Sequence, residues 1–98
     1  MEYEIKLNDG VVEVFFTGDI TFSENLAFRQ LLKELEGLEL TSGVFDLDNV
    51  GMVDSAGLGM FLIAREYAER AGWKLSVRGA KGHVASMLKL TKLATMLA

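Results

Sequence analysis

The chain has 98 residues, half of them hydrophobic, and this size and composition indicate one folded domain spanning residues 1–98. Its formal net charge of −4 disfavours nucleic acid and anionic membranes as partners, because both are bound by clustered Lys and Arg. The absence of cysteine excludes disulfides and thiolate metal sites. No apolar run approaches the length of a membrane span, and the acidic start is unlike a signal peptide.

The first part of the chain predicts a hairpin followed by a helix. Apolar and polar residues alternate over residues 3–7, which is the pattern of a half-buried strand. Asn-Asp-Gly at residues 8–10 predicts a tight turn, and the β-branched and aromatic residues 11–17 predict a second strand. Thr21 and Glu24 have the spacing of a capping box, which predicts a helix from there to about residue 36.

Two further strand–helix units complete the predicted domain. A buried strand is expected around residues 44–47, a helix over residues 55–71, a strand over residues 73–78 and a last helix from residue 81. The element order is then β-β-α-β-α-β-α. Because a helix that alternates with strands makes a crossover connection, we expect an α/β fold whose four-stranded mixed sheet carries three or more helices.

A short stretch at residues 54–59, Asp-Ser-Ala-Gly-Leu-Gly, lies where a loop turns into the second long helix. Asp54 and Ser55 are both good N-cap residues, since a short side-chain oxygen accepts hydrogen bonds from the first turn. The small residues after them leave the Ser55 hydroxyl accessible, and a phosphate there would meet free N–H groups and the positive end of the helix dipole. The plainer interpretation is that Ser55 only caps a helix.

Two leucines extend this feature along the helix. Leu58 and Leu62 follow Ser55 at i+3 and i+7, so all three lie on one face, on the otherwise polar side. Large apolar residues beside an accessible hydroxyl indicate a protein-docking surface, and we expect both leucines to be substantially exposed. The alternative is that a loop or the C-terminal segment covers them.

Neither catalysis nor metal binding is expected. Asp46, Asp48 and Asp54 are close in sequence and suggest a divalent cation, but carboxylates at strand ends are usually solvated, so we expect no metal and no cofactor. His83 is the one histidine and is far in sequence from Ser55. A nucleophilic serine needs a base and a group that orients the base, so we expect no enzymatic activity.

The chain resembles a STAS domain of the anti-sigma-factor-antagonist family over nearly its whole length. The resemblance rests on residues 54–59 after an apolar strand, on Gly-Asp-Ile at residues 18–20, and on the element order. It implies a bacterial, cytoplasmic regulator of transcription. Ser55 would be phosphorylated by an anti-sigma-factor serine kinase of the histidine-kinase-like ATPase fold, and a serine phosphatase would reverse this. The unphosphorylated form would bind the kinase and free the sigma factor.

The resemblance also implies a partner-binding surface around Ser55. Its expected members are Asp19, Thr21, Asp54, Ser55, Ala56, Gly57, Leu58, Gly59 and Leu62. The chain departs from the family at Thr21, where an aspartate is usual, and at residues 91–93, which read Thr-Lys-Leu instead of Thr-Gly-Leu. Two other hypotheses remain: a constitutive adaptor subunit of a transport or signalling complex, and a ligand-sensing domain with a small molecule between sheet and helix.

Overall fold

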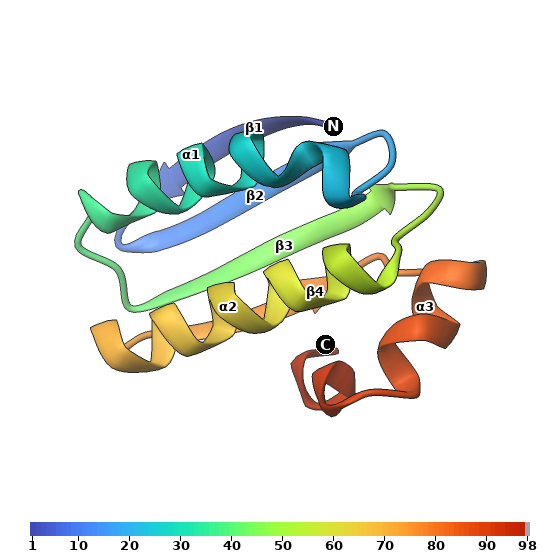
Figure 1. Ribbon diagram of the computed structural model, residues 1–98. Helices are drawn as coiled ribbons and strands as arrows, with labels where there is room; N and C mark the ends of the chain where they lie inside the picture. Colours follow the sequence, from blue (N-terminus) through green and yellow to red (C-terminus); the bar gives the residue numbers. More distant parts are fainter. Residues whose placement is uncertain (98) are drawn as a thin grey trace.

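A four-stranded sheet with two long helices on one face forms the centre of the structure, a computed structural model that describes residues 1–97 (Figure 1). α3 and the C-terminal turn lie beside β4 and α2. The elements are β1 (Glu2–Asn8), β2 (Val11–Thr17), η1 (Phe22–Glu24), α1 (Asn25–Glu36), β3 (Ser42–Asn49), α2 (Ser55–Ala71), β4 (Lys74–Arg78), α3 (Gly82–Lys89) and η2 (Lys92–Met96). The predicted order of strands and helices is confirmed.

The sheet is mixed, as the element order predicts. β1 and β2 form an antiparallel hairpin, whereas β2–β3 and β3–β4 pair in parallel. The hairpin turns at Asp9 and Gly10, whose φ angles of 50° and 78° are both in the left-handed region. This is the type I′ geometry that suits a two-residue turn between twisted strands. The parallel pairs need crossovers, which α1 and α2 supply.

Four phenylalanines pack together between the helices and the sheet. Phe16 of β2, Phe45 of β3, Phe28 of α1 and Phe61 of α2 are each at most 1% exposed. Their ring centroids lie 5.0–6.4 Å apart, mostly in edge or tilted arrangements that favour aromatic pairs. This cluster holds α1 and α2 side by side, so the N-terminal ends of both helices are positioned by the core.

The capping box predicted at the start of the first helix is wrong. A 3-10 turn, η1, precedes α1, so Glu24 itself occupies the N-cap position of α1 and does not reach back. The Thr21 hydroxyl lies 3.0 Å from the hydroxyl of Ser23, and Glu24 pairs with the N-terminal ammonium at 3.1 Å. The cap comes from another segment, because Asp54 accepts the hydrogen bond from the Phe22 amide.

Candidate functional site

Ser55 is the first residue of α2 and its side chain is exposed. The loop before it is anchored by Val53, which is fully buried and pairs with Ile20 in a short parallel bridge. The amide of Ile20 donates to the carbonyl of Met52 at 2.9 Å. Residues 18–21 therefore run alongside the loop that leads into α2, which brings the predicted site residues Asp19 and Thr21 next to that loop.

Asp54 caps two helical segments with one carboxylate. Its Oδ1 accepts from the amide of Gly57 at 2.7 Å, which makes it the N-cap of α2. Its Oδ2 accepts from the amide of Phe22 at 3.1 Å, at the start of η1. The first role was predicted from sequence. The second was not, because the partners are 32 residues apart and no local pattern records such a contact.

The two glycines that follow Ser55 have different roles. A Cβ on Gly57 would lie 2.2 Å from the carbonyl oxygen of Ile20 and 2.8 Å from a methyl of Val53. Only glycine therefore lets α2 approach the neighbouring segment so closely. A Cβ on Gly59 would meet nothing within 4 Å, and this glycine leaves the helix surface near Ser55 open.

The start of α2 retains part of its capacity to bind an anion. Asp54 already accepts from the amide of Gly57, as its predicted role as a cap requires, so that amide is not available to an anion. Within residues 1–97, the amides of Ser55 and Ala56 have no hydrogen-bond acceptor. These two amides and the helix dipole favour a negative charge here, whereas the carboxylate of Asp54 opposes it.

The two leucines predicted to be exposed differ. Leu62 is 36% exposed and lies on the outer face of α2. Leu58 is less exposed than predicted, because it is half-buried and packs against the hydrophobic core. The prediction of substantial exposure is therefore wrong for this residue. Two turns further along the same side of α2, Arg65 donates to the carbonyl of Lys92, so the C-terminal turn η2 lies beside that part of the helix.

A second apolar surface lies on the side of α2 that faces α1, and it was not predicted from the sequence. A groove of about 370 Å³ runs between α1 and α2 beside Ser55. Its lining residues are Phe22, Asn25, Phe28, Arg29, Leu32, Ala56, Gly59, Met60 and Ile63. Phe22 is 70% exposed and Ile63 is 54% exposed. The signal that was overlooked is Phe22, an aromatic residue in a polar turn directly before a helix.

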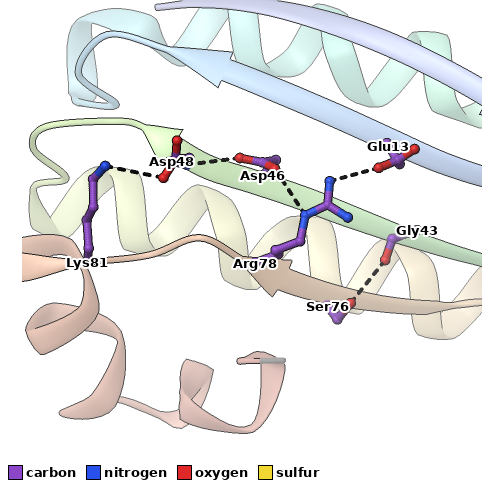
Figure 2. A network of polar contacts seen from close by, with 7 residues as sticks. All are labelled: Glu13, Gly43, Asp46, Asp48, Ser76, Arg78 and Lys81. Atoms are coloured by element: carbon purple, nitrogen blue, oxygen red, sulfur yellow. Dashed lines mark hydrogen bonds and ion pairs between the residues drawn. The ribbon is translucent and has the colours of Figure 1, made fainter.

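The three aspartates do not gather into a metal site. Asp46 accepts from Nε of Arg78 at 3.0 Å, and Asp48 pairs with Nζ of Lys81 at 3.2 Å (Figure 2). Asp54 caps α2 instead. Among the residues that the structure describes, no three potential ligands stand close enough to hold a metal ion.

His83 is exposed near the start of α3, and no hydrogen bond among residues 1–97 joins its side chain to Ser55. None of the described helices is both long enough and apolar enough to cross a membrane. What the site offers is an exposed hydroxyl, a rigid helix start and an apolar groove beside it.

A family model decides the classification. The model of the STAS domain matches residues 2–97. The chain belongs to the STAS domain family. No curated protein matches it by sequence.

Solved structures share this fold at low sequence identity. The anti-sigma factor antagonist SpoIIAA in its unphosphorylated form is 11% identical with a TM-score of 0.84, over 99% of this chain and 86% of that one. The phosphorylated form of Bacillus SpoIIAA has a TM-score of 0.76 at 12% identity, over 99% and 89%. An anti-sigma factor antagonist from Mycobacterium paratuberculosis is 21% identical with a TM-score of 0.84, over 98% and 81%. A sulfate transporter family protein from Wolinella succinogenes is 15% identical with a TM-score of 0.77, over 94% and 79%.

Proposed function

We propose that this STAS domain is an anti-sigma factor antagonist that switches partners through phosphorylation of Ser55. The unphosphorylated form binds an anti-sigma-factor serine kinase of the histidine-kinase-like ATPase fold, and the phosphorylated form is released until a serine phosphatase restores it. The observation that carries this proposal is the exposed Ser55 on a fixed helix start beside an apolar groove. That SpoIIAA has been solved in unphosphorylated and phosphorylated forms supports it.

Within the domain itself, a phosphate on Ser55 is tolerated. It adds a charge of about −1.5 to −2 at a helix N-terminus, where the dipole and the amides of Ser55 and Ala56 favour it. Repulsion from Asp54 opposes this. Because Ser55 is exposed, solvent and salt screen that repulsion. We therefore expect the phosphorylated domain to keep its fold.

In the complex with the kinase, the same phosphate is unfavourable. Docking on this end of the molecule would enclose the phosphate beside the exposed apolar side chains of Phe22, Leu62 and Ile63. An unpaired charge buried in an apolar contact costs several kcal/mol. The nucleotide of the kinase would add repulsion. A cost of about 3 kcal/mol weakens binding roughly a hundredfold or more.

The experiment begins with recovery of the partner. The tagged domain is used to capture its kinase from the native host, and the intact mass of the recovered domain shows whether it carries phosphate. Isothermal titration then compares the unmodified, phosphorylated, Ser55→Ala and Ser55→Glu forms. Ser86→Ala is the matched control, since Ser86 is another exposed helical serine, on α3.

We expect Ser55→Ala and Ser86→Ala to bind the kinase like the unmodified protein. Only Ser55→Ala should resist release by ATP. The phosphorylated form should bind about a hundredfold more weakly, and Ser55→Glu should reproduce part of that loss. Equal affinity of the phosphorylated and unmodified forms, or unfolding of the phosphorylated form in circular dichroism, would contradict the proposal.

A constitutive adaptor subunit is the second candidate, favoured by the likeness to the Wolinella succinogenes sulfate transporter family protein. In that role Ser55 is only part of the helix start. The domain would then form a stable stoichiometric complex that contains no phosphate. Its affinity would be the same for Ser55→Ala as for the unmodified chain, and ATP would release neither, so the same titrations separate the two candidates.

A further inference from the structure

The two edges of the sheet are protected to different degrees. At the β4 edge, Leu97 pairs with Val77 in a short bridge, and η2 contacts the strand. At the β1 edge, residues Glu2–Asn8 pair with β2 on their inner side, and no strand or bridge within residues 1–97 pairs with their outer side. Leu7 on this edge is 50% exposed. An edge strand that is unpaired on its outer side and lacks proline is a template for pairing with another strand.

The hairpin geometry shows which backbone groups of β1 face outward. A two-residue type I′ turn closes on a hydrogen-bonded pair, here Asn8 and Val11. Hydrogen-bonded and non-hydrogen-bonded pairs alternate along an antiparallel ladder. Lys6 and Glu4 therefore bond to β2. The N–H and C=O groups of the other alternating set, Tyr3, Ile5 and Leu7, point away from the sheet.

We propose that β1 pairs antiparallel with β1 of a second copy of this chain, about a two-fold axis at Ile5. In this register Ile5 faces Ile5 of the second copy, Tyr3 faces its Leu7, and Leu7 faces its Tyr3. All three pairs bring outward-facing groups together, and each exchanges two N–H···O bonds. The two sheets join into one continuous sheet, and the contact is isologous, as closed dimers require.

The charges on β1 select this register. With the axis at Ile5, Glu4 of each copy lies opposite Lys6 of the other, so two favourable cross-strand pairs form. An axis at Tyr3 would instead place Glu2 opposite Glu4. An axis at Glu4 would place that carboxylate directly opposite Glu4 of the second copy. Like charges directly opposite are unfavourable in a sheet.

The dimer leaves the phosphorylation site accessible. α2 contacts β4, at the other side of the sheet from the β1 edge (Figure 1). Pairing through β1 uses none of the residues around Ser55, so the dimer can be tested whether or not the proposed function is correct. A dimer would present two copies of the Ser55 surface.

Sedimentation equilibrium over a concentration series tests the dimer. We expect Glu4→Lys and Lys6→Glu each to weaken dimerisation about tenfold, because two attractive pairs become repulsive. The double variant Glu4→Lys/Lys6→Glu exchanges the charges and should restore it. Lys89→Glu on α3 is the control for a change of net charge and should have no effect. Thermal melts check folding, since Lys6 also faces Glu13 on β2.

Amide NMR tests the register. On raising the protein concentration, the amides of Tyr3, Ile5 and Leu7 should shift and exchange more slowly with solvent, whereas those of Glu4 and Lys6 should be protected throughout. A monomer at every concentration would overturn the proposal. So would a double variant no better than the single variants, or a dimer that leaves the three outward amides unchanged.

Discussion

Two exposed surfaces of the domain contrast sharply. On the sheet face opposite the helices, Arg78 bonds to Glu13 at 2.7 Å and to Asp46 at 3.0 Å, and Lys81 pairs with Asp48 at 3.2 Å (Figure 2). These charged groups meet partners from their own chain. At the start of α2, by contrast, Phe22 and the other large apolar side chains around Ser55 face solvent.

The contrast shows where binding energy is available. Exposed ion pairs are already hydrated and paired, so covering them gains little and desolvation costs energy. Exposed aromatic and aliphatic side chains gain free energy when a partner removes them from water. The helix end is therefore the surface suited to docking, and the sheet face is a solvated surface. The following variants test both halves of this statement.

Gly57→Ala should give the largest change in stability. The new methyl would lie 2.2 Å from the carbonyl oxygen of Ile20, a backbone atom that cannot turn aside. We expect a loss of about 3 kcal/mol in the free energy of unfolding, measured by denaturant titration. Gly59→Ala is the matched control and should stabilise by about 0.5–1 kcal/mol, because its methyl meets nothing. Equal effects of the two substitutions would show that α2 is not held against residues 18–20.

Asp54→Ala should lower the free energy of unfolding by about 2 kcal/mol, since it removes the caps of two helical segments. Asp54→Asn keeps one acceptor oxygen and should lose about half as much. Comparing Asp54→Asn with the unmodified protein measures the contribution of the second hydrogen bond, from the Phe22 amide. If Asp54→Asn is as stable as the unmodified protein, the hydrogen bond to the Phe22 amide contributes nothing.

The fold was predictable from sequence because its signals are local. Strand alternation, the turn at residues 8–10 and the helix stop near residue 37 depend on neighbouring residues, and each appears in the structure. The start of the first helix was mispredicted because the 3-10 turn η1 precedes it, and the carboxylate that accepts from the first amide of η1 belongs to Asp54, 32 residues from Phe22 along the chain. Local patterns contain no record of such a contact.

The site was predictable only in part, for the same reason. Asp54 as a cap and Ser55 as an exposed residue follow from helix-start chemistry. The groove does not, since it exists only where α1 lies beside α2. A helical wheel assigned Leu58 to the outer face, but a wheel for a single helix contains no information about the rest of the domain, and in the structure Leu58 packs against the hydrophobic core.

Phe22→Ser should weaken kinase binding without loss of fold. Because the side chain is 70% exposed, we expect little change in the free energy of unfolding and a loss of about 1–2 kcal/mol in binding, measured by titration with the captured kinase. Leu90→Ser is the control, since Leu90 is 85% exposed just after α3. If both substitutions weaken binding equally, the surface beside Ser55 has no special role.

Arg78→Gln should have the smallest effect, although Arg78 joins three strands. Glu13 and Asp46 raise the pKa of Arg78 further above its already high value, so the residue is charged at every pH at which the domain is studied. The Arg78 side chain is 44% exposed, and exposed pairs contribute roughly 0–1 kcal/mol. We therefore expect Arg78→Gln to lower the free energy of unfolding by less than about 1 kcal/mol, and this loss should nearly vanish in about 1 M salt. Lys74→Gln on the same strand removes a charge that makes no ion pair within residues 1–97 and controls for net charge. A salt-independent loss well above 1 kcal/mol would make the sheet face a structural element, and the contrast with the helix end would then have to be abandoned.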